Sequence, residues 1–241
     1  MGTGKRSLEN LVTLKILLAG ATGFLGSHLL FALLDKQYQI VIVKRSFSSS
    51  LNIDEFLKRV TAYNLDSVTL NDIFRKEKYF DAVIHLATEY GREQDSLQRI
   101  VSTNICFSLE LLQLSIQYKT PLWINTGTFF PKNYNYYALS KAQFFEWGRQ
   151  LIKGNETHFV NLVLHHMIGP KDSDTKFSMY VVNNCLSNTK ELALTSGLQK
   201  RDFINVLDVV NVYSLLLSHK WLGKNHIHEF EVGYQFLLLP L

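Results

Sequence analysis

Cysteine is scarce in this chain, and dense runs of one charge are missing. The 241 residues include two cysteines, Cys106 and Cys185, which are far apart and lack the spacing of a disulfide framework or a zinc site. Both lie in apolar stretches, so we expect buried thiols. The net charge is +4. Because no dense tract of lysine and arginine accompanies it, we expect no nucleic-acid partner.

Long apolar runs are also missing. No stretch is long enough to cross a bilayer, and the first ten residues lack the apolar region of a signal peptide. Hydrophobic residues nevertheless make up 46% of the chain and charged residues 19%, which is typical of a globular protein with one sizeable core. We therefore expect a soluble, cytoplasmic protein with no membrane partner.

Strand-like and helix-like segments alternate along the chain. The expected strands are 14–19, 39–43, 81–87, 122–125 and 158–164, and the expected helices are 28–35, 54–59, 97–117 and 137–151. Such alternation needs crossover connections, which predicts an α/β fold of the Rossmann type with a doubly wound parallel sheet. We place a dinucleotide-binding domain at residues 1–165. A small substrate lobe, interleaved with late elements of the sheet, is expected at 166–241.

A glycine-rich turn follows the first expected strand directly. Its glycines allow a tight turn, close approach of the backbone to a pyrophosphate, and close packing of helix on sheet. The positive end of the helix dipole then favours the anion. We predict a dinucleotide site here; the alternative is an ordinary strand–helix turn. The predicted cofactor contacts in the turn are Gly20, Thr22, Gly23, Phe24, Leu25 and Gly26.

The end of the second expected strand bears on which nicotinamide nucleotide binds. NAD-binding proteins usually have an acidic residue there, which accepts a hydrogen bond from the ribose 2′-hydroxyl. This chain has Lys44 and Arg45 instead, and two cations suit a 2′-phosphate. We therefore predict NADP(H) rather than NAD(H); the alternative is a solvated loop with two surface cations. Asp66 is predicted either to border the adenine or to cap a helix.

Tyr137 and Lys141 lie one helical turn apart in the expected helix 137–151. A free tyrosine has a pKa of about 10. A nearby ammonium group favours the phenolate and lowers that pKa. Lys141 would also bind the nicotinamide ribose. Thr126, at the carboxyl end of the expected strand 122–125, would hold the substrate oxygen, because ligands bind at strand ends in open parallel sheets. The set predicts proton transfer at a carbonyl or an alcohol.

The order of these motifs resembles a known family, the extended short-chain dehydrogenases/reductases of the NAD-dependent epimerase/dehydratase type. The resemblance covers residues 14–232 and implies an enzyme that acts on nucleotide sugars. It implies Thr126, Tyr137 and Lys141 as the catalytic residues. The motifs that carry it are Gly20-x-x-Gly23-x-x-Gly26, His85-Leu86-Ala87, Asn104, Thr126, Tyr137-x-x-x-Lys141 and Arg201-Asp202-Phe203. The further cofactor contacts that it implies are Leu86, Ala87 and Asn104.

Several short segments resemble one branch of that family more closely, the CDP-abequose synthases. The segments are 85–91, 125–126, 129–130, 169–170 and 176–177. The resemblance implies NADPH-dependent reduction of a CDP-linked 4-keto-3,6-dideoxyhexose for bacterial O-antigen. It also implies that Thr88 and Glu89 lie where cofactor and substrate meet, and that Arg201 binds the nucleotide pyrophosphate. His166 stands where the family often has asparagine, and we expect either a substrate contact or a satisfied core histidine.

Two departures from the family pattern shape the prediction. Dehydratases carry Asp-Glu directly after the catalytic threonine, whereas Gly127 and Thr128 follow here, which argues against a dehydratase. The apolar segment 235–241 is an unusual terminus, so we expect a shortened substrate lobe. The predicted activity is reduction of a nucleotide-linked 4-ketosugar. The alternatives are a 4-epimerase of the same family and a non-catalytic NADP(H)-binding protein.

Two further features concern partners and metals. By family analogy, helices 97–117 and 137–151 would form the face of a homodimer. His226, His228 and Glu231 have a spacing that would suit a zinc site, but spacing alone is a weak signal, and we predict no metal.

Overall fold

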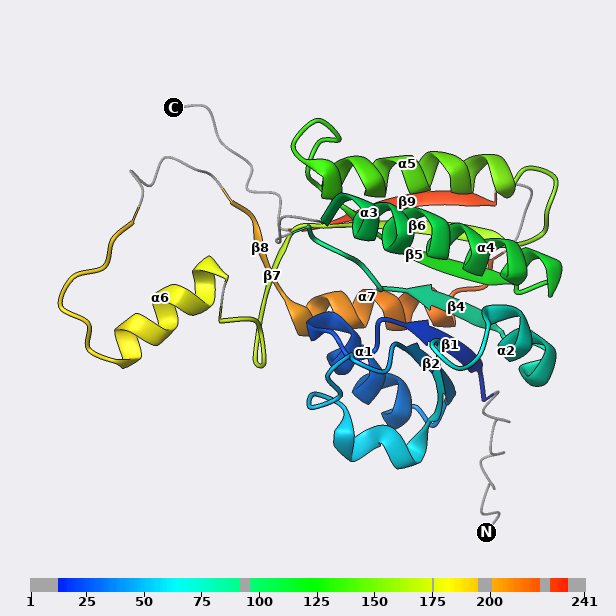
Figure 1. Cartoon of the computed structure of the whole chain (residues 1–241), viewed down its shortest axis with the longest axis horizontal. Coiled ribbons are helices and arrows are strands. Elements are labelled where there is room, and N and C mark those ends of the chain that lie inside the picture. The colour runs from blue at the N-terminus through cyan, green and yellow to red at the C-terminus, as the bar shows by residue number, and fades with distance from the viewer. Residues whose placement is uncertain (1–12, 92–95, 175, 195–200, 222–225, 234–241) are drawn as a thin grey trace, which may run out of the picture.

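A parallel sheet with helices on both faces forms the body of the molecule (Figure 1). The computed structural model describes residues 13–91, 96–174, 176–194, 201–221 and 226–233. Within these residues the large sheet has seven strands in the order β3-β2-β1-β4-β5-β6-β9. Its strands are β1 (Lys15–Ala19), β2 (Gln39–Lys44), β3 (Thr61–Asn64), β4 (Ala82–His85), β5 (Leu122–Thr128), β6 (His158–Leu164) and β9 (Ile227–Val232).

The strand order reverses direction at the centre of the sheet. The chain runs outward from β1 to β3 and then crosses back to β4, which pairs with the other side of β1. This is the order of a Rossmann fold, and ligands bind at the carboxyl ends of the strands beside such a reversal. The predicted fold class is confirmed.

Apolar residues alternate between the two faces of each central strand. In β1, Ile16 and Leu18 pack into one cluster, and Leu17 and Ala19 pack into the other. Both faces are therefore buried, which explains why the strand is apolar throughout. The helices over the first face are α1 (Phe24–Asp35) and α7 (Val206–Ser218). The helices over the second face are α2 (Leu70–Glu77), α4 (Ser108–Gln117) and α5 (Tyr136–Leu151).

The predicted helix 97–117 consists of three consecutive segments. α3 (Ser96–Ile100) leads into a π-helical stretch, η2 (Val101–Phe107), which leads into α4. A 3.6-residue apolar period does not distinguish these helix types, so the sequence predicted one helix. The wider segment matters here, because it carries the buried Asn104. The expected helix 54–59 is also a tighter type, the 3₁₀ segment η1 (Asp54–Arg59).

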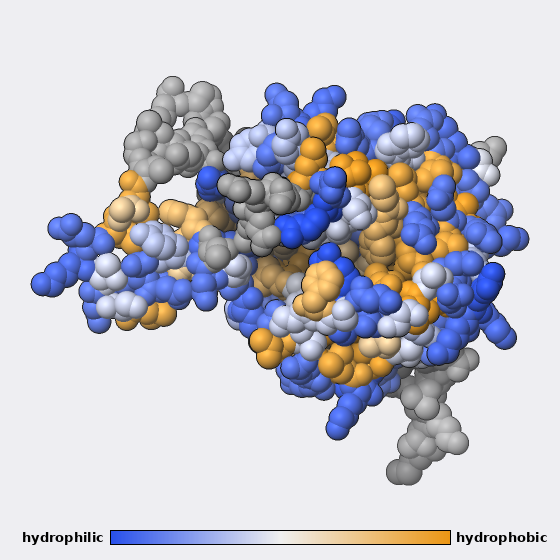
Figure 2. Space-filling model, in the orientation of Figure 1, coloured by the Kyte–Doolittle hydropathy of each residue, from blue (hydrophilic) through white to orange (hydrophobic). Residues whose placement is uncertain are grey.

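The chain after β6 partly leaves the large sheet. β7 (His166–Ile168) pairs in parallel with β8 (Phe203–Asn205) in a separate two-stranded sheet. Between them, α6 (Phe177–Leu186) projects from the body, with polar and apolar side chains both on its surface (Figures 1 and 2). α7 and β9 then return to the large sheet. The boundary between residues 165 and 166 stays a prediction, and the segment 235–241 lies outside the described residues.

The prediction of buried cysteines is wrong. Cys106 and Cys185 are both exposed free thiols. Cys106 lies on the outer side of η2, and Cys185 lies on α6, which buries none of its described side chains. Local apolar composition does not reveal that these elements have a solvent-facing side. No helix within the described ranges is long and apolar enough to cross a membrane.

Candidate active site

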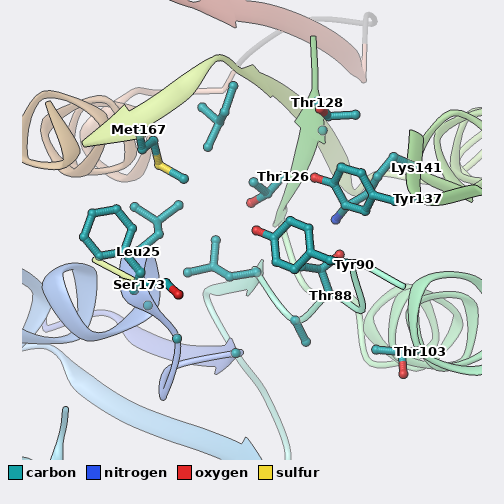
Figure 3. A pocket seen from close by; sticks show the side chains of 18 of the residues that line it. Leu25, Thr88, Tyr90, Thr103, Thr126, Thr128, Tyr137, Lys141, Met167 and Ser173 are labelled. Atoms are coloured by element: carbon teal, nitrogen blue, oxygen red, sulfur yellow. The ribbon is translucent and has the colours of Figure 1, made fainter. Parts of the chain in front are cut away.

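A cavity of about 1090 Å³ opens at the carboxyl ends of the central strands. It lies between the turn after β1, the ends of β4 and β5, the start of α5 and the segment from β7 to α6 (Figure 3). Its size suits a ligand larger than a single small metabolite. The predicted site residues that line it are Gly20, Thr22, Gly23, Phe24, Leu25, Gly26, Lys44, Arg45, Asp66, Leu86, Ala87, Thr88, Thr126, Tyr137, Lys141, His166 and Arg201.

Two of the three motif glycines are required by the fold itself. Gly20 has a φ of +91°, and a Cβ there would lie 2.5 Å from the backbone nitrogen of Ala87. A Cβ on Gly26 would collide with the carbonyl oxygen of Gly20. Gly23 differs, because its φ is −76° and the nearest atom to an added Cβ is 3.5 Å away. The space beside Gly23 therefore faces the cavity, and packing within the protein does not require glycine at this position.

The amino end of α1 is open to an anion. Gly23 is its N-cap residue and offers no side chain to the first N–H groups. The first turn also contains no acidic residue. The first N–H groups of a helix have no partner within the helix and favour negative charge. The uncapped helix end and the space beside Gly23 together fit the pyrophosphate of a dinucleotide.

Basic and acidic side chains lie together where the cavity reaches the carboxyl ends of β2 and β3. Lys44 ends β2, and the Arg45 guanidinium lies 4.5 Å from the centre of the Phe47 ring. Asp66 accepts a hydrogen bond from the backbone N–H of Ser46 at 2.6 Å. Hydrogen bonds from Ser46 and the nearby cations hold the pKa of Asp66 below its usual range. Asp66 therefore carries a negative charge in the cavity, beside both cations.

The alternative interpretation of Asp66 as a helix cap is wrong. The helix that follows, α2, is capped by Thr69, whose side chain accepts a hydrogen bond from the backbone N–H of Asp72 at 3.2 Å. Three residues separate Asp66 from the first residue of α2. Asp66 therefore lies outside the helix, and its side chain lines the cavity.

The start of α5 places Tyr137 and Lys141 in the cavity. Asn135 caps the helix by accepting a hydrogen bond from the backbone N–H of Ala138 at 2.8 Å. Tyr137 and Lys141 lie side by side one turn apart, close to Thr126 (Figure 3). The Tyr90 ring packs on the Tyr137 ring, with centroids 4.9 Å apart.

Burial sets the proton affinities of this pair. Burial raises the pKa of Tyr137 above its usual value, and Tyr90 raises it further, while a hydrogen bond with Thr128 opposes both. Burial lowers the pKa of Lys141 to about 8. The lowering of the Tyr137 pKa by Lys141, expected from their spacing, is not among these effects. In the protein alone, Tyr137 is therefore a neutral phenol with a proton to donate.

Thr126 lies inside a strand and not after it, because β5 extends to Thr128. Its hydroxyl is 2.5 Å from the phenol oxygen of Tyr213 in α7. Tyr90 and Thr128 also line the cavity, although neither was among the predicted site residues. Thr128 had a detectable signal, since residues two apart in a strand share a face. Tyr90 lies in a loop, and its signal was its place in the segment 85–91, which resembles one branch of the family.

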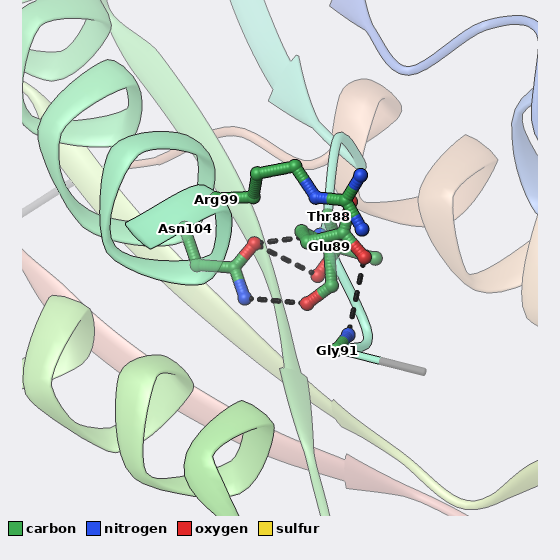
Figure 4. Close-up of polar contacts among 5 residues, drawn as sticks. All are labelled: Thr88, Glu89, Gly91, Arg99 and Asn104. Carbon is green, nitrogen blue, oxygen red and sulfur yellow. Dashed lines mark hydrogen bonds and ion pairs between the residues drawn. The ribbon is translucent and has the colours of Figure 1, made fainter. Parts of the chain in front are cut away.

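Asn104 and Glu89 do not line the cavity themselves, but they form hydrogen bonds with Thr88 and Gly91, which do (Figure 4). The Asn104 side chain accepts hydrogen bonds from Glu89 N at 2.7 Å and Thr88 Oγ1 at 3.3 Å. It donates to Glu89 O and to Ser140 Oγ, each at 2.9 Å. Glu89 itself accepts a hydrogen bond from the backbone N–H of Gly91 at 3.1 Å. Asn104, expected as a cofactor contact, thus connects the loop after β4 to α5.

A side-chain hydrogen bond joins His166, in β7, to Arg201, which precedes β8. The Arg201 guanidinium donates a hydrogen bond to Nε2 of His166 at 2.7 Å, so that nitrogen is an acceptor. Burial and then the charge of Arg201 lower the pKa of His166, which keeps the ring neutral. His166 is half-buried at the cavity wall, so it is not the satisfied core histidine of the alternative interpretation.

The three residues considered for zinc are not brought together. His226 and His228 lie at the amino end of β9, next to the ring of His158. Glu231 lies toward the other end of that strand, where its carboxylate accepts a hydrogen bond from Nε2 of His165 at 2.6 Å. Across the described ranges, no group of three or more histidine, cysteine or acidic side chains has the arrangement of a metal site.

Comparisons with known proteins identify the family of the chain. The family model for the NAD dependent epimerase/dehydratase family matches residues 16–233. The CDP-abequose synthase of Salmonella typhimurium (strain LT2) is 35% identical over 229 residues, which cover 90% of this chain and 74% of that protein. The CDP-abequose synthase of Salmonella muenchen is 31% identical, with 92% and 75% covered.

Solved structures share the fold at lower identity. UDP-glucuronic acid 4-epimerase from Bacillus cereus, in complex with NAD, has a TM-score of 0.78 and 23% identity, covering 92% of this chain and 78% of that chain. UDP-glucose 4-epimerase from Thermotoga maritima, with UDP-glucose, has a TM-score of 0.77 and 22% identity, covering 91% and 76%. By its motifs, its sheet order and the match over most of its length, the chain belongs to the NAD-dependent epimerase/dehydratase family.

Proposed function

We propose that this protein is an NADPH-dependent reductase of a nucleotide-linked 4-ketosugar, and that its substrate is a CDP-linked 4-keto-3,6-dideoxyhexose. The names of the two Salmonella relatives and the resemblance described above support the substrate class. The observation that supports the reaction type is the Lys44–Arg45 pair, which suits a consumed NADPH, in the same cavity as Tyr137. Lys141 and Thr126 line that cavity too.

One group of cavity residues would bind the cofactor. The turn containing Gly23 and the amino end of α1 would bind the cofactor pyrophosphate, and Lys141 would bind the nicotinamide ribose. Lys44 and Arg45 would bind the 2′-phosphate, which distinguishes NADPH from NADH. When bound, the nicotinamide supplies the hydride that is added to C4 of the sugar. A consumed cofactor of this kind suits a reductase, because an epimerase regenerates its cofactor in each cycle.

Tyr137 would donate its proton to the C4 oxygen as that oxygen gains negative charge. In the protein alone, burial keeps this phenol protonated, so a proton is available for donation. Thr126 would hold the same oxygen by a hydrogen bond, and Arg201 would bind the nucleotide pyrophosphate.

The test is a pair of assays on the purified chain. NADPH and NADH are titrated by fluorescence, and a CDP-4-keto-3,6-dideoxyhexose is then added while the nicotinamide absorbance is followed. Ketosugar-dependent oxidation of NADPH supports the proposal. Interconversion of UDP-glucose and UDP-galactose with bound NAD, without net oxidation, would identify a 4-epimerase. Cofactor binding without either reaction would identify a non-catalytic protein.

Two neighbouring tyrosines provide a matched pair of variants. We expect Tyr137→Phe to lower kcat by about 10²- to 10⁴-fold, the usual contribution of a positioned proton donor. The affinity for NADPH should stay unchanged. Tyr136 precedes it in the same helix but is exposed and does not line the cavity. Tyr136→Phe should therefore retain wild-type turnover; equal turnover by both variants would refute the role of Tyr137.

A further inference from the structure

Tyr213 is a buried residue outside the proposed catalytic set. It lies in α7, is 0% exposed, and packs in the apolar cluster between α1, α7 and the sheet. A buried phenol hydroxyl needs a hydrogen-bond partner, since leaving it unpaired is costly. Its partner in the structure is Thr126, 87 residues earlier in the chain, with the two oxygens 2.5 Å apart.

The face of β5 explains how the two residues meet. Ile124 packs in the same cluster as Tyr213. Thr126 is two residues further along the strand and shares that face. At this point the strand reaches the cavity, so the threonine side chain touches both the core and the cavity. The phenol of Tyr213 therefore contacts Thr126 from the core side, opposite to the ligand.

The direction of this hydrogen bond determines what Thr126 can offer to a ligand. Each hydroxyl has one proton and can also accept. A phenol is a more acidic group than an aliphatic alcohol, so it is the better donor of the two. Burial also raises the pKa of Tyr213, which keeps its proton in place at any working pH. When Tyr213 donates to Thr126, the threonine proton is left to point into the cavity.

A ketone oxygen only accepts hydrogen bonds, so it needs a donor from the protein. Thr126 on β5 and Tyr137 on α5 lie close together at the cavity (Figure 3). With its proton pointing inward, Thr126 would donate a hydrogen bond to the C4 oxygen while Tyr137 supplies the proton. If Thr126 instead donated its proton to Tyr213, only its oxygen lone pairs would face the ketone. Those lone pairs would repel the ketone oxygen. The hydroxyl of Tyr213 thus determines whether Thr126 assists or hinders reduction.

We propose that Tyr213 is a positioning residue that fixes Thr126 as a hydrogen-bond donor to the carbonyl oxygen of the substrate. This inference rests on the proposed reductase function. Because the effect appears as negative charge develops on the oxygen, it should change kcat more than KM.

The experiment is a double-mutant cycle with Tyr213→Phe and Thr126→Val, measured as NADPH oxidation with the CDP-4-keto-3,6-dideoxyhexose. Each change removes one hydroxyl and keeps the shape of the side chain. We expect Tyr213→Phe to lower kcat by about tenfold, with KM within twofold and NADPH affinity unchanged. In the Thr126→Val background, Tyr213→Phe should have no further effect. Additive losses, or wild-type kcat in Tyr213→Phe, would overturn the inference.

Tyr63→Phe is the matched control. Tyr63 is also buried, and its hydroxyl bonds one side chain, Glu77, away from the cavity. Both tyrosine variants lose one buried hydrogen bond, so their thermal stabilities should fall together, while kcat falls only in Tyr213→Phe. A kcat loss in Tyr63→Phe of the same size would assign the effect to general loosening and refute the inference.

A second variant covers the case in which Tyr213→Phe does not fold. Thr126→Ser keeps the hydroxyl but loses the β-branch that normally restricts its rotamer. If Tyr213 orients this hydroxyl, kcat should stay within about threefold of wild type. A loss as large as that of Thr126→Val would contradict the proposal. Absence of ketosugar reduction by the wild type would refute the proposed function itself, and the inference with it.

Discussion

Gly23 offers a way to separate cofactor binding from folding. Its φ of −76° is open to any residue, and a Cβ would meet only Gly20 O, at an ordinary 3.5 Å. Gly23→Ala should therefore leave the free energy of unfolding within about 0.5 kcal/mol of wild type. Alanine gains about 0.4–1 kcal/mol from a less flexible unfolded chain, and it loses a similar amount, about 0.5–1 kcal/mol, at a helix N-cap, where glycine is preferred over alanine.

Binding should respond very differently. The added methyl group occupies the space where the pyrophosphate would approach the first N–H groups of α1. A hydrogen bond to a charged group contributes about 1.5–3 kcal/mol. Loss of one such bond corresponds to roughly 10- to 100-fold weaker binding. We expect that loss for NADPH in a fluorescence titration of Gly23→Ala.

Gly26→Ala is the comparison variant from the same turn. Its Cβ would collide with the backbone of Gly20 and Ala21, which cannot move aside as a flexible side chain would. We expect it to lower the free energy of unfolding by about 2 kcal/mol or more in urea denaturation. Wild-type NADPH affinity in Gly23→Ala would show that the pyrophosphate does not bind at this turn. Equal destabilisation by both variants would refute the distinction drawn between the two glycines.

Two further predictions concern charge. Replacing Lys44 and Arg45 together by alanine should weaken NADPH binding by about 10- to 50-fold and NADH binding by less than about threefold, because only NADPH carries the 2′-phosphate; equal losses in the two titrations would refute the cofactor preference. Burial holds the pKa of Lys141 at about 8, below its usual 10.5, so its charge opposes folding. This penalty is fully present below about pH 8 and disappears as the pH rises to about 10.5, because the unfolded state binds the proton more tightly in between. Lys141→Met should thus raise the free energy of unfolding by about 3 kcal/mol at pH 7 and by much less at pH 10, while it removes reductase activity; an equal gain at both pH values in urea denaturation would contradict the burial argument.

The fold class was predictable because it depends on local patterns. The strands of the central sheet are apolar on both faces, which is characteristic of parallel sheets covered on both sides. The glycine turn and the Tyr137–Lys141 spacing are also local, and both reach the cavity as expected. Within one turn or one helix, the covalent geometry of the backbone fixes which residues are neighbours.

The environments of Asp66, Cys106 and Cys185 were not predictable from the local sequence, for one common reason. Asp66 satisfied the sequence pattern of a helix cap, yet the helix begins only after Thr69. Cys106 and Cys185 lie in apolar segments but face solvent. In each case, the local sequence allowed more than one environment, and packing against the rest of the chain selected one of them.

The sequence by itself determined the Rossmann sheet, the phosphate-binding turn and the tyrosine–lysine pair, because each depends on backbone geometry over a few residues. Only the tertiary structure determined that Tyr213 contacts Thr126, that Asn104 supports the loop after β4, and that Arg201 bonds His166. These contacts join residues 15 to 87 positions apart. Their formation depends on how each helix rotates and packs against the sheet, and periodicity along the chain does not encode that rotation.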